Sequence, residues 1–284
     1  MRYVRPESYN QGGLTLAMEY SAYEYLKVEV ADRVATVTIN RPDVRNAVNS
    51  ALHHEFEQIW IDLAEDHDVN AILLTGAGNT FSVGGDVTSR DKPTKSKGRG
   101  GRRIVMADGR RVIENLLDVE QPIVAAINGD ALGFAANVAL LCDVTVACET
   151  AKLADTHVAL GAVAGDGGAV IWPLLIGPNR AKEFLMLGDT ITGADAARIG
   201  LVNYALPAAQ VLPKAKELAQ RLADGPTWAI RWSKLAVNKW LKQQANLIMD
   251  TGLAYEALTL TTRDHKEAVK AMVEKRKPNF VRAR

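Results

Sequence analysis

The sequence predicts an α/β fold. Short apolar strands alternate with amphipathic helices over residues 25–160, which is the pattern of βαβ crossovers on a largely parallel sheet. From Gly167 onward the pattern becomes almost wholly helical. The chain has 284 residues, of which 48% are hydrophobic, so it can bury a full core. We therefore expect an N-terminal extension over residues 1–23, an α/β core over 24–215 and a helical region over 216–284.

The first elements are predicted to be a β-hairpin, a helix and a buried strand. Residues 25–41 alternate apolar and polar side chains on both sides of a turn at Ala31 and Asp32. Residues 46–66 carry apolar side chains at spacings of three and four, which form one stripe on a helix. The stripe consists of Val48, Leu52, Phe56, Ile59 and Leu63. Residues 69–78 then read as a buried strand that runs into a glycine turn.

The alternation continues along the chain. Further strands are expected over residues 122–129, 144–149 and 151–155, with helices over 110–120 and 134–143. The helices expected after Gly167 cover 168–177, 179–189, 193–202 and 212–224, and the last sixty residues are also expected to be helical.

Composition and charge argue against several classes of protein. The net charge of +1 does not suit an overall field built for nucleic acid or an anionic membrane. No apolar run approaches the roughly 20 residues that span a bilayer, and no secretion signal opens the chain, so a cytoplasmic protein is expected. Cys142 and Cys148 are expected to be buried thiols. The five histidines form no metal-binding pattern, and we expect no metal.

Residues 87–111 form a basic segment with nine Lys or Arg and two Asp. Its glycine, serine and proline content indicates a mobile loop. Such a loop is either simply solvated or contacts the phosphates of a ligand. RNA binding is the minor alternative, because no aromatic residue is interleaved for base stacking.

Two glycine turns follow consecutive buried strands, at residues 75–86 and 127–137. In open α/β sheets, ligands collect where strands end in this way. The residues after Gly133 begin a helix, so the backbone N–H of Phe134 is an unpaired donor at a helix N-terminus. Two such turns that converge would form an oxyanion hole. Neither turn is a GxGxxG or Walker motif, which disfavours a nucleotide-binding oxidoreductase.

A third pattern places His157 nine positions before Asp166 among small and aliphatic residues. One interpretation is a catalytic base, because an imidazole titrates near neutral pH, together with the carboxylate that orients it. The alternative interpretation is a hydrogen-bonded core histidine and a cap for the helix that opens after Asp166.

Taken together, four stretches in order resemble the crotonase superfamily, the enoyl-CoA hydratase/isomerase family. They are INRPDVRNAVN, ILLTGAGNTFSVGGD, PIVAAINGDALGFAANVALLCDVTVACETAKLAD and VEKRKPNF. The resemblance implies a spiral of ββα turns with a C-terminal helical region, assembled as a homotrimer or hexamer. It also implies an acyl-CoA thioester substrate, with coenzyme A as part of that substrate and no other cofactor.

The resemblance assigns residues to the site. Its oxyanion donors map to the backbone N–H groups of Gly85 and Phe134, and Phe134 replaces the usual glycine, which is expected to reshape the acyl pocket. Its coenzyme A contacts map to Arg45, Ala47, Val83, Gly84, Asp86 and Lys277.

The two catalytic glutamates of true hydratases map to Asn137 and His157. Because Asn137 cannot exchange a proton near neutral pH, the two-carboxylate mechanism cannot operate unchanged. The run from Asp155 to Asp189 is similar to 6-oxocamphor hydrolase of the same superfamily. That likeness implies a dyad of His157 and Asp166 that activates water, with Glu256 lining the site; Glu256 also reads as a plain surface residue.

The functional prediction is an enoyl-CoA hydratase/isomerase family enzyme that forms an enolate in the oxyanion hole, with His157 oriented by Asp166 as the base. The first alternative is a hydrolase that cleaves a carbon–carbon bond of a cyclic β-diketone or a β-keto acyl-CoA. The second alternative is a non-catalytic RNA-binding scaffold that uses the basic segment 87–111.

Overall fold

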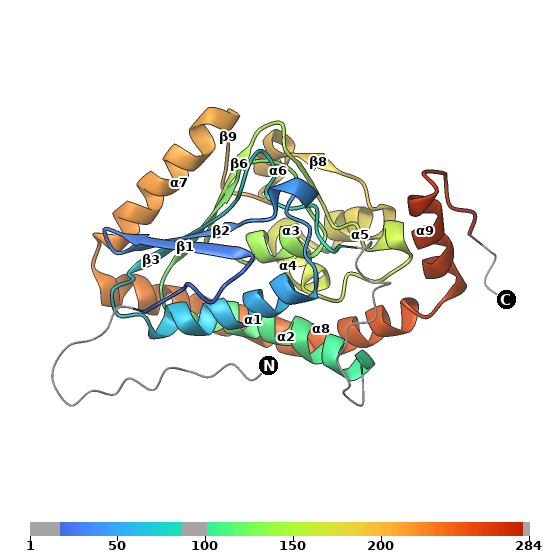
Figure 1. The fold of residues 1–284 in the computed structure, drawn as a ribbon, viewed down its shortest axis with the longest axis horizontal. Coiled ribbons are helices and arrows are strands. Elements are labelled where there is room, and N and C mark those ends of the chain that lie inside the picture. Colours follow the sequence, from blue (N-terminus) through green and yellow to red (C-terminus); the bar gives the residue numbers. More distant parts are fainter. Residues whose placement is uncertain (1–17, 87–100, 281–284) are drawn as a thin grey trace.

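The protein is described by a computed structural model over residues 18–86 and 101–280, with side chains from Gly109 onward in the second range. Two sheets lie at its centre, and helices surround them (Figure 1). The strands are β1 (Leu26–Ala31), β2 (Val34–Ile39), β3 (Ala71–Gly76), β4 (Ile123–Ile127), β5 (Ala131–Leu132), β6 (Val144–Cys148), β7 (Lys152–Ala154), β8 (Ile191–Thr192) and β9 (Tyr204–Leu206). The helices are α1 (Ser50–Glu65), α2 (Gly101–Asp118), α3 (Phe134–Leu140), α4 (Gly168–Ile176), α5 (Pro178–Leu187), α6 (Gly193–Ile199), α7 (Ala208–Ala223), α8 (Thr227–Thr259) and α9 (Arg263–Val273), with 3₁₀ turns η1 (Pro42–Val44) and η2 (Val158–Leu160).

The larger sheet has the strand order β1-β2-β3-β4-β6-β9. β1 and β2 form an antiparallel hairpin, whereas the other strand pairs of this sheet are parallel. β3 and β4 are buried along their whole length, as expected for strands covered on both faces. The predicted hairpin, buried strand and parallel α/β core are therefore confirmed.

The smaller sheet has the order β5-β7-β8. The chain passes from the larger sheet into the smaller one and then into a helix, since β4 is followed by β5 and α3. A second pass runs from β6 to β7, which pairs parallel with β5. This repetition is the ββα spiral that the resemblance implies.

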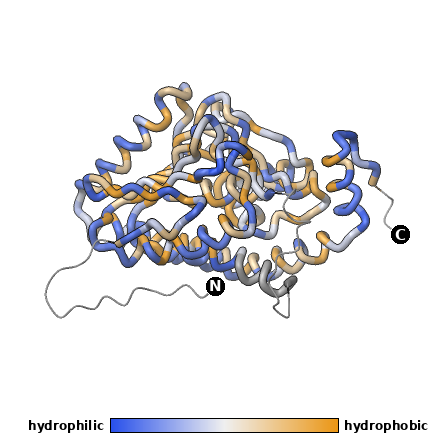
Figure 2. The backbone as a smooth tube through the Cα atoms, viewed as in Figure 1, coloured by the Kyte–Doolittle hydropathy of each residue, from blue (hydrophilic) through white to orange (hydrophobic). Residues whose placement is uncertain are grey.

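Helices cover the larger sheet. α1 buries the predicted apolar stripe, including Leu52, Phe56 and Ile59, and Asn49 caps its N-terminus by accepting a hydrogen bond from the Leu52 backbone N–H. α1, α2 and α8 lie along the lower side of the view in Figure 1, and α7 contacts β3, β4 and β6. Figure 2 shows the hydrophobic segments gathered in the central strands. The expected division at residue 215 remains a prediction, and α7 continues across it.

Two details differ from the sequence-based expectations. Residues 101–111, expected as part of a mobile loop, belong to helix α2, which begins at Gly101. The strands β5 and β8 have two residues each, too few for a periodic signal.

Cys142 and Cys148 are buried free thiols, as expected. In the part of the chain that is described, no helix combines the length and apolarity needed to cross a membrane.

Candidate active site

Three chain segments leave the sheets side by side and build the candidate site. A parallel bridge joins Ser82 to Ala131, so the first glycine turn runs beside β5. β5 in turn pairs parallel with β7, which places Gly133 next to the residues that follow Ala154. The backbone N–H of Gly133 donates to the Ala154 carbonyl at 2.8 Å. Because the three segments run in the same direction, the residues after each strand meet at one edge.

The two predicted oxyanion donors lie on the wall of one cavity of about 120 Å³. A parallel bridge pairs Gly85 with Val48. In it, the Val48 N–H donates to the Gly84 carbonyl, and the Asp86 N–H donates to the Val48 carbonyl. In this parallel pattern the N–H of Gly85 points away from Val48. Phe134 is the first residue of α3, so its N–H has no partner within the helix.

The two glycine turns touch closely. A Cβ on Gly84 would lie 2.5 Å from the Leu132 carbonyl oxygen, and Gly84 has a φ of +79°. The Phe134 ring is buried, stacks on His53 at 4.8 Å between ring centroids and meets Phe56 edge-on. Only glycine fits at position 84. The Phe134 ring packs against His53 and Phe56 of α1.

His157 lies between two carboxylates. Its Nδ1 atom is 2.7 Å from Oδ1 of Asp155, and its Nε2 atom is 3.1 Å from Oδ2 of Asp166. His157 and Asp166 line the cavity, whereas Asp155 is 1% exposed and lies behind the imidazole. The predicted pair of His157 and Asp166 is thus brought together, and the sequence analysis missed Asp155 as its third member.

The pKa of the imidazole follows from this arrangement. Burial disfavours the cation of His157, but the charges of Asp166 and Asp155, with their hydrogen bonds, outweigh it and raise the pKa well above 6.5. Burial likewise opposes ionisation of Asp155, but the charge and hydrogen bonds of His157 outweigh it and lower the pKa of Asp155. The two carboxylates therefore favour the imidazolium form of His157. The role of His157 as the base stays a prediction.

Asn137 is fully buried behind this pair and does not line the cavity. Its Nδ2 atom donates to Asp155 Oδ2 and to Asp166 Oδ1, both at 3.0 Å. Its Oδ1 atom accepts a hydrogen bond of 3.1 Å from the indole N–H of Trp172. The structure thus places Asn137, grouped with the catalytic residues in the sequence analysis, in contact with two carboxylates and not with the cavity.

Asp166 does not cap the helix that follows it. The N-cap of α4 is Gly167, and no side chain bonds to the first turn of this helix. The carboxylate of Asp166 instead contacts His157 and Asn137. Gly168 keeps the neighbouring space open, because a Cβ there would lie 2.2 Å from Asp155 Oδ2. The alternative interpretation of Asp166 as a cap is therefore wrong.

Glu256 lies in the last turns of α8, is 7% exposed and lines the same cavity as His157. The glycine pair Gly165 and Gly252 brings α8 close enough for this. A Cβ on Gly165 would lie 2.5 Å from the Gly252 carbonyl oxygen and 2.8 Å from Glu256 Oε2. The interpretation of Glu256 as a surface residue is wrong, because its side chain is buried and lines the cavity.

Most of the residues expected to contact coenzyme A come together. Val83 donates its backbone N–H to the Arg45 carbonyl, and Asp86 forms a 3.5 Å ion pair with Arg41. Ala47 is buried beside them, and the Arg45 guanidinium binds Asp130 at 2.8 Å. Lys277 is exposed after the end of α9, and within the described residues no hydrogen bond or ion pair joins it to this group.

The ligand atoms of Asp155, His157 and Asp166 lie within 4.8 Å of one another, a spacing that also suits a metal ion. The two carboxylates, however, approach different nitrogens of one imidazole ring. A single ion binds only one ring nitrogen, so these contacts favour ion pairing. The absence of a metal remains a prediction.

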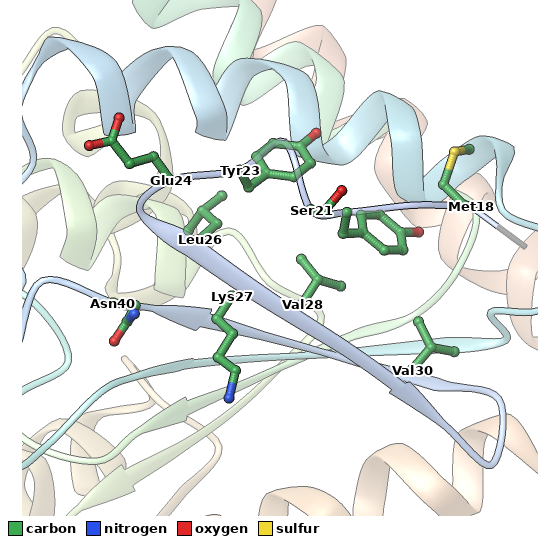
Figure 3. A pocket seen from close by; sticks show the side chains of 10 residues that line it. Met18, Ser21, Tyr23, Glu24, Leu26, Lys27, Val28, Val30 and Asn40 are labelled. Atoms are coloured by element: carbon green, nitrogen blue, oxygen red, sulfur yellow. The ribbon is translucent and has the colours of Figure 1, made fainter. Parts of the chain in front are cut away.

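A larger hollow of about 510 Å³ lies between residues 18–24 and β1 (Figure 3). Its charged wall residues are Glu24 and Lys27, and none of the predicted site residues lines it. The chemistry is therefore assigned to the smaller cavity.

Of the basic segment, residues 87–100 lie outside the described range, while Arg110 pairs with Glu114 and Arg111 pairs with Glu57.

Comparison with known proteins identifies the family of the chain. The crotonyl-CoA hydratase of Syntrophomonas wolfei is 33% identical to this chain, and the alignment covers 92% of this chain and 99% of the hydratase. A short-chain-enoyl-CoA hydratase of Clostridium acetobutylicum is also 33% identical, and the alignment covers 88% of this chain and 95% of that enzyme. The crystal structure of an enoyl-CoA hydratase/isomerase from Pseudoalteromonas atlantica superposes with a TM-score of 0.82 at 26% identity, covering 91% of this chain and all of the other. The family model for enoyl-CoA hydratase/isomerase matches residues 29–283, and the chain belongs to this family.

Proposed function

We propose that the protein is an enzyme that acts on an acyl-CoA thioester, with hydration of an enoyl-CoA as its reaction. The observation that carries the proposal is that Gly85, Phe134, His157 and Asp166 line one cavity. Backbone donors for an oxyanion and groups that exchange protons thus face the same small space. The relatives described as enoyl-CoA hydratases support the substrate class.

The N–H groups of Gly85 and Phe134 would bind the thioester carbonyl oxygen and stabilise the enolate. Such donors act on charge that develops during the reaction, and each contributes about 3–4 kcal/mol to the transition state. The N-terminal end of α3 adds a favourable dipole at the same point.

Proton transfer would use side chains that line the same cavity. Asp166 and Glu256 are the carboxylates that line the cavity, and either can hold a water molecule and accept its proton. Because the neighbouring carboxylates raise the pKa of His157, its proposed task is to return a proton to the α carbon through its contact with Asp166. This division replaces the two glutamates of true hydratases.

A second candidate function is hydrolytic cleavage of a carbon–carbon bond in a cyclic β-diketone or a β-keto acyl-CoA. The raised pKa of His157, whose Nε2 atom lies 3.1 Å from Asp166, favours it. Water would lose a proton to Asp166 or Glu256 as it adds to one carbonyl, and the carbon–carbon bond would break to leave a carboxylic acid and an enolate. The enolate carbon would take a proton from the imidazolium, which the protonated carboxylate then restores. The oxyanion donors serve this enolate equally well.

Mass spectrometry of purified protein distinguishes the two. One reaction contains crotonyl-CoA, and a second contains a cyclic β-diketone, free and as its CoA ester. Addition of water to crotonyl-CoA, lost in a His157→Gln variant, supports the hydratase. Ring opening with crotonyl-CoA untouched supports the hydrolase. Turnover of neither substrate class would contradict both.

Other expectations stay predictions. They include coenzyme A contacts at Arg45, Ala47, Val83, Gly84, Asp86 and Lys277, assembly as a homotrimer or hexamer, no additional cofactor and a cytoplasmic location. The RNA-binding alternative rests on residues 87–111, most of which lie outside the described side chains.

A further inference from the structure

We propose that Asp155, Asn137 and Trp172 form a positioning network that fixes the ring of His157 and holds Asp166 against its Nε2 atom. The network acts through His157 and Asp166 and does not touch the substrate. Its activity readout rests on the proposed function, whereas its effect on the imidazole does not.

Asp155 uses both of its oxygens within the protein. Oδ1 lies 2.7 Å from His157 Nδ1 and also accepts the His157 backbone N–H at 3.1 Å. Oδ2 accepts from Asn137 at 3.0 Å. A carboxylate held at three points in a buried place cannot rotate, so the imidazole plane is fixed with it.

Asn137 links the two carboxylates with one nitrogen. Its Nδ2 atom donates to Asp155 and to Asp166. Asparagine supplies these two donors without a charge, whereas an aspartate of the same shape would place a third carboxylate between the other two. The residue type at this position thus suits a neutral bridge.

Trp172 determines which way the amide of Asn137 points. The indole N–H is only a donor, and it bonds to Asn137 Oδ1 at 3.1 Å. If the amide turned over, its NH₂ group would face the indole N–H and its oxygen would face two carboxylates. One orientation therefore satisfies all three partners, and the opposite one satisfies none.

The other titratable groups near His157 come from different elements. Glu256 on α8 and His53 on α1 line the same cavity. His265 on α9 bonds to the Leu160 carbonyl, three residues after His157. Asp155 and Asp166 are the carboxylates for which direct contacts with the ring are observed.

The test compares Trp172→Phe with Trp60→Phe. Both indoles are fully buried, but within the described residues Trp60 Nε1 has no hydrogen-bond partner. The control therefore loses a similar ring without loss of a hydrogen bond. Asp155→Asn removes the charge next to Nδ1. The first readout is the titration of the His157 ring followed by NMR, with its signals assigned by comparison with His157→Gln. The second readout is the pH profile of kcat, measured with the CoA ester that the enzyme turns over.

We expect Asp155→Asn to lower the pKa of His157 and to reduce kcat by about tenfold or more with little change in KM. Trp172→Phe should shift the His157 resonances and the pH profile, whereas Trp60→Phe should change neither. An unchanged His157 titration in Asp155→Asn overturns the proposal, as does equal behaviour of the two Trp variants. If Asp155→Asn does not fold, the Trp pair decides. If no CoA ester is turned over, the proposed function fails and the NMR titration alone judges the network.

Discussion

His157 Nδ1 lies 2.7 Å from Oδ1 of Asp155, a residue only two positions earlier in the chain. The contact places a buried negative charge behind an imidazole whose other nitrogen already faces Asp166. Two carboxylates on one ring stabilise its cation. The arrangement therefore favours a protonated His157, which could give a proton as well as take one.

The first prediction concerns stability against pH. The raised pKa of His157 contributes stability that is complete below 6.5 and is lost as pH rises through the folded-state pKa. The lowered pKa of Asp155 contributes stability that is complete above 3.8 and is lost as pH falls through its folded-state pKa. Both contributions are complete between these values.

Urea unfolding of the wild type and Asp155→Asn measures the effect, since most other groups cancel in the difference. The advantage of the wild type should be larger at pH 5.5 than at pH 8.5. An advantage that does not change with pH would mean that His157 is not charged in the folded protein.

The second prediction is that His157→Gln lowers both activity and stability. Loss of a proton-transfer group reduces turnover roughly 100- to 10,000-fold. Removal of the cation also leaves two buried carboxylates without their partner, which costs about 3–5 kcal/mol of unfolding free energy. Steady-state kinetics and urea unfolding measure the two effects. The control is His54→Gln, because the His54 side chain is exposed at the surface. This variant should change neither turnover nor unfolding free energy.

The third prediction separates charge from shape at Asp166. Asp166→Asn keeps an oxygen for Asn137 only by turning its NH₂ group toward His157, where the carboxylate oxygen had been. We expect turnover to fall by about 100-fold or more with the fold intact, as judged by circular dichroism. Asp195→Asn is the control, since this exposed carboxylate pairs with Arg198 on α6. If Asp166→Asn unfolds instead, the carboxylate is chiefly structural.

Much of this fold follows from local sequence patterns. The alternation at residues 25–41 and the stripe from Val48 to Leu63 predict the hairpin and α1, because each has a clear period. The start of α2 at Gly101 was missed, since Gly101 and Gly109 lower the helix propensity of this stretch. Tertiary contact decides such a case: Gly109 packs against Leu253 of α8.

The site was predictable only where one segment carries the pattern. Glycine turns and the spacing of His157 and Asp166 are visible in the sequence. Asp155 could have been noticed as a carboxylate two residues before a candidate histidine at the end of a strand. Burial of Glu256 was not visible, because it depends on the close approach of Gly165 and Gly252 from segments far apart in the chain.

The fourth prediction tests that approach. Gly165→Ala would place a Cβ 2.5 Å from the Gly252 carbonyl oxygen and 2.8 Å from Glu256 Oε2. Backbone atoms cannot yield cheaply, so α8 should move away from the loop and turnover should fall by about tenfold or more, since catalytic groups tolerate little misplacement. Gly225→Ala is the control, because its new Cβ first meets the flexible end of Ile230 at 2.6 Å and Gly225 does not line the cavity. Equal kinetics for both variants would contradict the role of the glycine contact.

The fifth prediction tests the backbone donor at Phe134. Proline is tolerated in the first turn of a helix, where its missing N–H is not needed by the helix. Phe134→Pro therefore removes the proposed oxyanion donor, and Phe134→Ala removes only the ring that packs on His53 and Phe56. Both variants should lose stability, by about 3–5 kcal/mol for the ring. The proline variant should in addition lose roughly 100- to 1,000-fold in kcat relative to the alanine variant. If the two variants turn over substrate equally well while both remain folded, the N–H of Phe134 does not bind the reacting oxygen.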